Sequence, residues 1–225
     1  MARAWETLET VATAEGPVSL RRRGERDFLI VLGTRVLMTS AAHRSEDRLG
    51  TAACAGLDRL PAPRVLIGGL GMGYTLRAAL DATGPGARVV VAELEPAVLR
   101  WCRSWLAPLT RGAAADPRVE VRVADVAAVI REAAAGRGPF HAIALDLFEG
   151  PRGDRGEAQH PIYGDRALTA TARALAPGGV LAVWSEAEAP GFERRLASAG
   201  FAVTTSRAGR GGRRHVIYEA RLPSA

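Results

Sequence analysis

The pattern of apolar and polar positions changes near residue 64. Before that point, short apolar runs are separated by turn-like polar segments, which predicts a small antiparallel hairpin or meander. The runs are Val18–Leu20, Phe28–Leu32 and Val36–Met38. A helix is expected next, capped by Ser45 and extending to about Leu57. Pro61 and Pro63 then end it.

After residue 64, strand-like and helix-like segments alternate, which predicts a parallel sheet with right-handed crossovers and helices on both faces. The expected strands are Val65–Ile67, Val89–Ala92, Val119–Val123, Ile143–Leu147 and Val180–Trp184. Helices are expected at about 73–82, 96–106, 126–134 and 165–175, the last ended by Pro177-Gly178-Gly179. A further helix at 192–199 precedes a terminal hairpin, Phe201–Thr205 with His215–Ala220. We therefore expect an N-terminal β region at 1–44 and one α/β domain at 45–225.

Composition agrees with a folded domain that has a sizeable core, since 48% of the residues are hydrophobic and 24% are charged. All 30 basic residues are arginine, so the net charge of +6 is modest evidence for a nucleic-acid partner. Cys54 and Cys102 are expected as free core thiols. The sequence has no signal peptide at its start and no apolar stretch of about 20 residues, so we expect a cytoplasmic protein without a membrane partner.

A glycine-rich turn follows the first parallel strand, at Gly69, Gly71 and Gly73. Glycine lets a backbone turn sharply and approach a ligand closely, because no Cβ intrudes. The dinucleotide fingerprint G-x-G-x-x-G is not met, since Tyr74 stands at its last position. The spacing G-x-G-x-G is typical of adenosyl-sulfonium sites. Such glycines also close ordinary strand–helix turns, so the turn alone does not decide between these readings.

Three carboxylates stand at three successive strand ends and strengthen the prediction of a nucleotide site. Glu93 ends the second strand, where a carboxylate can accept both ribose hydroxyls. Asp125 can accept the exocyclic amine of adenine, can cap the following helix, or can do both. Asp146 ends the fourth strand and is expected at the same edge of the sheet. Together they predict an adenosine site.

These residues resemble the spermidine synthase family, aminopropyltransferases of the class I methyltransferase fold. Gly68 to Gly73 lies over the family's G-G-G-D-G-G, and Glu93-Leu-Glu95 over its E-I-D. Asp116-Pro-Arg-Val119 matches D-P-R-V, and Phe140 to Glu149 follows Y-D-V-I-I-x-D-S-S-D. The resemblance runs from about residue 28 to 186. It implies a mostly parallel, Rossmann-like sheet of seven strands with a C-terminal antiparallel hairpin and an N-terminal β-hairpin.

The resemblance also implies a site. The residues expected to bind the co-substrate, S-adenosylmethionine or its decarboxylated form, are Gly68, Gly69, Gly71, Gly73, Glu93, Asp125, Val126 and Asp146. The residues expected to act on the acceptor are Glu149, Asp146 and Tyr163. Two departures stand out: the family's glycine-motif Asp is Gly71, and its catalytic Asp is Glu149. The family's tyrosine-histidine-glutamate cluster is not recognisable around Glu46-Asp-Arg48.

The chemistry needs carboxylates, because an acceptor amine is mostly protonated at neutral pH and must lose a proton before it attacks. Asp146 and Glu149 can divide binding and deprotonation between them. The residues equally allow that Asp146 only holds the donor and Glu149 is a solvated loop residue. No metal is expected.

The leading hypothesis is an aminopropyltransferase-like enzyme with a small-molecule amine as partner. A methyltransferase acting on a small molecule or protein is the alternative, favoured by Gly71. A non-catalytic adenosyl- or RNA-binding protein is a third, prompted by the basic turns Arg21–Arg23 and Arg207–Arg214, although solvated hairpin turns explain these better. A homodimer is left open.

Overall fold

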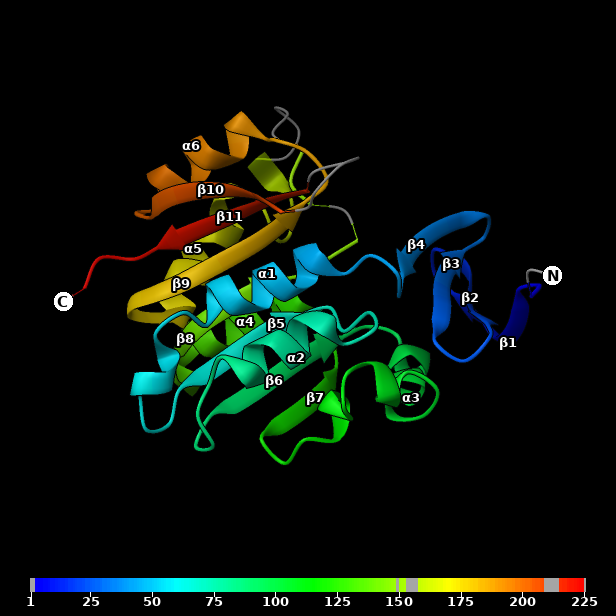
Figure 1. The fold of residues 1–225 in the computed structure, drawn as a ribbon. Helices are drawn as coiled ribbons and strands as arrows, with labels where there is room; N and C mark the ends of the chain where they lie inside the picture. The colour runs from blue at the N-terminus through cyan, green and yellow to red at the C-terminus, as the bar shows by residue number, and fades with distance from the viewer. Residues whose placement is uncertain (1–2, 149, 153–157, 209–214, 225) are drawn as a thin grey trace.

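The computed structural model describes residues 3–148, 150–152, 158–208 and 215–224. Its N-terminal part is a four-stranded antiparallel sheet in the order β1-β2-β3-β4, one strand more than the apolar runs predicted. The strands are β1 (Glu6–Thr13), β2 (Gly16–Arg23), β3 (Asp27–Leu32) and β4 (Arg35–Thr39). Strand β1 escaped prediction because it is amphipathic and largely exposed, with few apolar residues. This sheet lies beside α3, apart from the main sheet (Figure 1).

The main sheet has seven strands in the order β10-β11-β9-β8-β5-β6-β7. Strands β5 to β9 run parallel, and β10 and β11 form the antiparallel hairpin at one edge. The bounds are β5 (Arg64–Gly68), β6 (Arg88–Glu93), β7 (Val119–Val123), β8 (Phe140–Leu145), β9 (Leu175–Ser185), β10 (Ala202–Ala208) and β11 (His215–Arg221). The order reverses between β5 and β8, where open α/β sheets bind their ligands. The predicted mixed sheet is confirmed.

Helices cover both faces of this sheet and enclose two hydrophobic cores (Figure 1). One core lies under α1 (Arg44–Ala53), α2 (Tyr74–Asp81) and α3 (Pro96–Arg103). The other lies under α4 (Val126–Glu132), α5 (Asp165–Ala174) and α6 (Pro190–Ser198). Short 3-10 turns occupy Leu57–Arg59, Ala107–Leu109 and Ala113–Ala115, and a π turn occupies Ala133–Arg137. Alternate residues of β5 divide between the cores, as in a strand buried on both sides.

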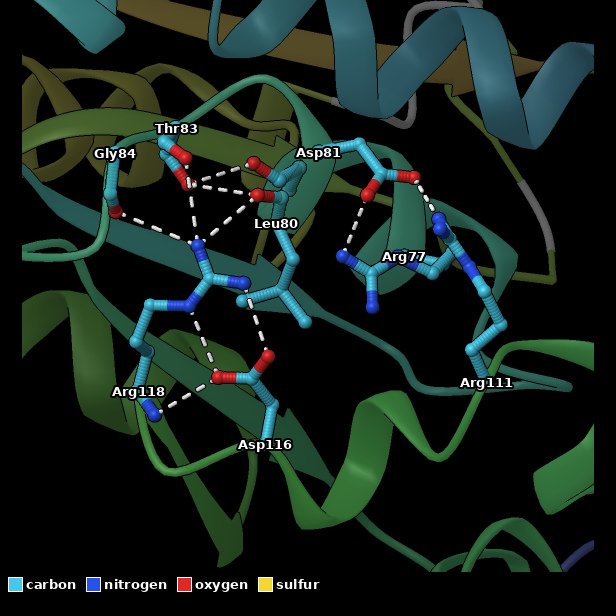
Figure 2. Close-up of polar contacts among 9 residues, drawn as sticks. Arg77, Leu80, Asp81, Thr83, Gly84, Arg111, Asp116 and Arg118 are labelled. Carbon is cyan, nitrogen blue, oxygen red and sulfur yellow. Dashed lines mark hydrogen bonds and ion pairs between the residues drawn. The ribbon is translucent and has the colours of Figure 1, made fainter.

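The D-P-R-V segment is a structural clamp (Figure 2). Arg118 makes a paired contact with Asp116, through its Nε and Nη2 at 2.9 Å each. Its Nη1 donates to the carbonyls of Leu80, Thr83 and Gly84 at 3.1–3.3 Å. These carbonyls lie at and beyond the C-terminal end of α2, where helices leave acceptors unpaired. The clamp therefore fixes the end of the helix that begins at the glycine turn.

Hydrogen bonds from α3 to Glu9 join the N-terminal sheet to the main domain. Glu9 of β1 accepts hydrogen bonds from Trp101 Nε1 and Arg100 Nη2, both at 2.6 Å. These contacts, led by the bond from Trp101, lower the pKa of Glu9. The ring of Trp101 is fully buried in the core, whereas Trp105 is exposed.

Three further expectations are corrected or confirmed. Ser45 does not cap α1; the N-cap is His43, and the Ser45 hydroxyl points to other partners described below. Pro177-Gly178-Gly179 does not end α5 but lies inside β9, where the register with β8 slips. Cys54 and Cys102 are buried free thiols, as predicted. Within the described ranges, no helix combines the length and apolar character needed to cross a membrane.

Candidate active site

The glycine turn after β5 is pressed against the end of β8. The backbone N–H of Gly69 donates to the carbonyl of Ala92 at 2.9 Å, which ties the turn to β6. Gly69 has φ +88°, and a Cβ there would stand 2.3 Å from the carbonyl oxygen of Asp146. Only glycine fits this close approach. The turn and Asp146 therefore belong to one compact site.

Two other predicted positions serve packing. A Cβ on Gly68 would stand 2.8 Å from Val126 Cγ2, so the first residue of α4 lies directly against the strand end. Gly73 is the N-cap of α2. The structure thus brings Gly68 and Val126 together and places Gly73 where a helix N-terminus opens toward the site.

Gly71 is enclosed by two sulfur atoms. A Cβ on Gly71, which has φ +51°, would stand 2.9 Å from Met38 Sδ, and the neighbouring Met72 N–H donates to the same sulfur at 3.2 Å. On the other side, the Cys102 thiol donates to the Gly71 carbonyl at 3.2 Å. Burial raises the pKa of that thiol to about 12, so it remains protonated. Strand β4 of the N-terminal sheet thereby supplies one wall of the turn.

Glu93, at the end of β6, is buried and held by backbone donors. One carboxylate oxygen accepts from Leu70 N–H at 2.8 Å and the other from Glu95 N–H at 2.9 Å. Burial nevertheless raises the pKa of Glu93 above its usual value, an effect that these N–H donors oppose. Each oxygen keeps a second lone pair. The carboxylate is therefore oriented in advance and can still accept a pair of hydroxyls.

Asp125 follows β7 and caps α4, because its Oδ1 accepts from Ala127 N–H at 2.8 Å. The predicted helix cap is confirmed. Its side chain is exposed, and the contacts of Oδ1 leave the second oxygen available for an exocyclic amine. The cap and the adenine contact are compatible.

Asp146 follows β8 directly, and its Oδ2 accepts from Thr75 Oγ1 at 2.6 Å. Burial is the main reason that its pKa rises to about 7; the nearby charge of Glu46 adds to the rise, and the Thr75 hydrogen bond opposes it. A carboxyl group with a pKa near neutrality can accept a proton from an amine and release it again. Asp146 therefore has the properties of a general base.

Glu46 is the residue that the sequence interpretation missed. It lies in the first turn of α1, is buried, and its charge reaches Asp146 and Tyr74. Within the described residues, neither Glu46 nor Asp146 has an ion-pair partner. The available signal was a Glu directly after the predicted cap Ser45, which is also typical of an ordinary N-terminal helix turn. Only the fold brings it to the end of β8.

The other two residues predicted to act on the acceptor, Tyr163 and Glu149, are not placed beside Asp146 by the described contacts. Tyr163 is 1% exposed, and its ring packs between His160, 4.9 Å away, and Phe192, 5.7 Å away, in the second core. No hydrogen bond between described residues joins it to Asp146. Glu149 lies outside the described residues.

The basic turns are partly neutralised. Arg22 pairs with Glu6, Arg23 with Asp27, and Arg207 with Glu188. Residues 209–214 of the second turn lie outside the described residues. The ion pairs favour solvated hairpin turns over a nucleic-acid surface.

The curated proteins to which this chain is similar are polyamine aminopropyltransferases. Over 148 residues, 62% of this chain, it is 34% identical to a polyamine aminopropyltransferase of Mycobacterium tuberculosis, of which the match covers 27%. Over 114 residues, 49% of this chain, it is 36% identical to a polyamine aminopropyltransferase of Nitrosomonas europaea, of which the match covers 33%. The chain thus matches about a quarter to a third of the length of these curated relatives. No family model matches it.

The structural comparison covers almost the whole chain. Spermidine synthase from Thermotoga maritima superposes with a TM-score of 0.75 at 17% identity, over 97% of this chain and 74% of that one. The chain shares the fold of this spermidine synthase. A spermidine synthase solved in complex with the transition state analogue AdoDATO gives a TM-score of 0.74 at 17% identity, over 97% of this chain and 73% of that chain. The fold is that of a class I methyltransferase-like domain preceded by an antiparallel sheet.

The motif resemblance described in the sequence analysis bears on the wall around Gly71. The position where the family pattern has an acidic residue is here a glycine whose Cβ direction is filled by Met38. An acidic side chain at 71 would need Met38 to move and a non-glycine residue at positive φ. The departure is thus accommodated by two positions, 38 and 71, that lie 33 residues apart in the sequence.

Proposed function

We propose that this chain is an aminopropyltransferase-like enzyme that alkylates an amine, with decarboxylated S-adenosylmethionine as donor. The observation that carries the proposal is the contact between the Gly69 turn and Asp146, whose pKa of about 7 suits a base. The similarity to polyamine aminopropyltransferases supports it. Glu93 and Asp125 would hold the ribose and adenine of the donor.

The residues would divide the work as follows. The donor's sulfonium group already activates the neighbouring carbon, so the protein mainly positions the two reactants in line. The amine nitrogen, once deprotonated, attacks that carbon, and the carbon–sulfur bond breaks with its electron pair left on sulfur. Asp146 would take the proton that the nitrogen gives up. Glu46 would stabilise the acceptor in its ammonium form. Glu149 remains a candidate for either task.

Methyl transfer from S-adenosylmethionine is the second candidate, and the Gly71–Met38 contact favours it. The wall formed by Met38 carries no charge, so it offers nothing to hold a protonated amine at the end of a decarboxylated donor. A donor whose tail does not end in a lone ammonium group would lose less binding energy at the Met38 wall. The two candidates share every residue of the adenosine site.

The by-product of turnover distinguishes these candidates. The purified protein is incubated with each donor and a panel of short amines and diamines, and the nucleoside products are separated by chromatography. Methylthioadenosine supports aminopropyl transfer, whereas S-adenosylhomocysteine supports methyl transfer. The proposal is wrong if neither appears with any acceptor while the protein still binds a donor. Asp146→Asn should lose turnover and keep its fold.

A further inference from the structure

Two neighbouring residues of α1, Ser45 and Glu46, and one residue of β11, His215, form a hydrogen-bonded line that ends at Glu46. The Ser45 hydroxyl donates to Glu46 Oε2 at 2.5 Å, and Ser45 Oγ lies 3.0 Å from His215 Nδ1. Ser45 and His215 are 170 positions apart. The line therefore joins the start of α1 to the start of β11, at the edge of the sheet where Asp146 lies.

The direction of the protons follows from the donor inventory. A hydroxyl carries one proton, and here that proton points to the Glu46 carboxylate. The contact with His215 can then be a hydrogen bond only if Nδ1 carries a proton and donates to the serine oxygen. His215 must therefore be protonated at Nδ1, with Ser45 relaying the hydrogen bond to Glu46.

The fold holds both ends of this line. Ser45 and Glu46 are buried, and the Glu46 carbonyl lies 3.2 Å from Thr75 Oγ1, whose short hydrogen bond goes to Asp146. The His215 ring packs against Trp184 of β9, with ring centres 4.7 Å apart. Pairing of Val216 with Ser185 fixes the start of β11 beside the end of β9.

We propose that His215, acting through Ser45, is a positioning residue that orients Glu46 as the second carboxylate of the acceptor site. This rests on the proposed function. Glu46 and Asp146, a pair of carboxylates without a cationic partner among the described residues, match an acceptor that carries an ammonium group. The substrate class is then a primary amine or diamine, bound as its cation before Asp146 takes the proton.

Of the charged and titratable groups described around Glu46, His215 is the one suited to orient its carboxylate. From α2, Tyr74 faces it, and burial raises the pKa of that phenol to about 12, so it stays neutral. From β8, Asp146 faces it with like charge. On α1 itself, Asp47 accepts from His43 at 2.8 Å, and that histidine stacks on Tyr74. Among the described residues, His215 is the histidine that connects to the Glu46 carboxylate, through the Ser45 hydroxyl.

The histidine tautomers test the geometry without any turnover. Nitrogen-15 NMR of the ligand-free protein reports which ring nitrogen of each histidine is protonated. His141 and His160 are internal references, since each Nδ1 accepts backbone N–H groups and must be unprotonated. We expect the opposite tautomer for His215, with the preference lost in Ser45→Ala. A His215 that is unprotonated at Nδ1 would overturn the proposal whatever the protein catalyses.

Kinetics tests the role. His215→Ala should raise KM for the amine about tenfold, the effect of one charge-linked hydrogen bond, and leave the donor affinity measured by calorimetry unchanged. His215→Asn, whose amide stands near the position of Nδ1, should restore most of the loss. Equal losses for amine and donor, or no rescue by Asn, would reduce His215 to a structural residue. Absence of turnover in the wild type would refute the proposed function, and the NMR result would still decide the positioning of Glu46.

Discussion

The proposed donor side and the proposed acceptor side of the site are built differently. On the donor side, Gly69, Glu93 and Asp125 each stand at the end of a parallel strand, and backbone N–H groups hold both carboxylates. On the acceptor side, Asp146 and Glu46 come from β8 and α1, and side chains hold them: Thr75 for one, Ser45 and His215 for the other.

This difference determines which of the two sides can change in sequence without loss of the fold. Backbone donors at strand ends follow from the fold, so any sequence that forms the sheet presents them. A side-chain line requires particular residues far apart in the chain to be present together. The donor side should therefore be retained wherever this sheet forms, whereas the acceptor side can be remodelled to suit another amine.

The largest effect is expected at the contact between the two sides. Gly69→Ala forces a Cβ against the Asp146 carbonyl and a non-glycine residue to φ +88°, and it should destabilise the fold by about 4 kcal/mol. Gly33→Ala is the matched control: its φ is +57° with open space around the Cβ, and it should cost about 1 kcal/mol. Urea denaturation measures both. Equal costs would show that the close approach is not tight.

The next effect concerns the donor side alone. Glu93→Gln removes the charge and one of two acceptors for the Leu70 and Glu95 N–H groups, and it should weaken donor binding roughly 10- to 100-fold. Calorimetry with methylthioadenosine measures the affinity. Glu120→Gln, an exposed change on β7, should leave affinity unchanged. If Glu93→Gln binds as well as the wild type, the carboxylate does not contact the ribose.

Support behind the donor side should affect stability without affecting binding. Arg118→Ala removes the paired contact with Asp116 and three hydrogen bonds to carbonyls, and it should destabilise the fold by about 2 kcal/mol. Arg111→Ala, which removes an exposed ion pair with Asp81, should cost less than about 0.5 kcal/mol. Thermal unfolding measures which of the two variants is destabilised more. A loss of donor affinity in Arg118→Ala would show that the D-P-R-V segment takes a direct part in binding.

The last effect is a difference in pH dependence rather than in stability at a single pH. The pKa of Asp146 is higher in the folded protein, about 7 against 3.8, so its contribution to stability should fall as pH rises from about 4 to 7. Asp146→Asn should remove that decline. Asp116 behaves oppositely: Arg118 lowers its pKa to about 2, so its stabilisation is lost as pH falls from about 4 to 2. Denaturation midpoints across pH 2–8 test both slopes, and an unchanged slope in Asp146→Asn would contradict the assigned burial.

The sequence predicted the main sheet well because its strands and helices follow from the local pattern of apolar and polar residues. Strand–helix alternation placed Glu93, Asp125 and Asp146 at the ends of successive strands along the chain, and those positions need no knowledge of distant residues. Ser45 shows the limit. As a serine before a helical run it read as a cap, yet its hydroxyl is used by Glu46 and His215, and the partner in β11 cannot be inferred from local pattern.

The same limit applies to Met38. A short apolar strand predicts burial, but not that its sulfur would fill the space beside Gly71. The Pro177-Gly178-Gly179 segment failed for the opposite reason, because a signal that often ends helices lies here inside a strand that bulges against β8. Contacts set by tertiary packing, rather than by spacing, were the ones that escaped prediction.

Calorimetric titration of the wild-type protein with methylthioadenosine tests the central claim most directly, since this molecule carries the adenosine and sulfur of either donor without a transferable tail. The account predicts saturable binding at one site per chain that Glu93→Gln weakens and Glu120→Gln does not. A flat titration at millimolar ligand, with the protein folded, would contradict the adenosine site on which both proposed functions depend.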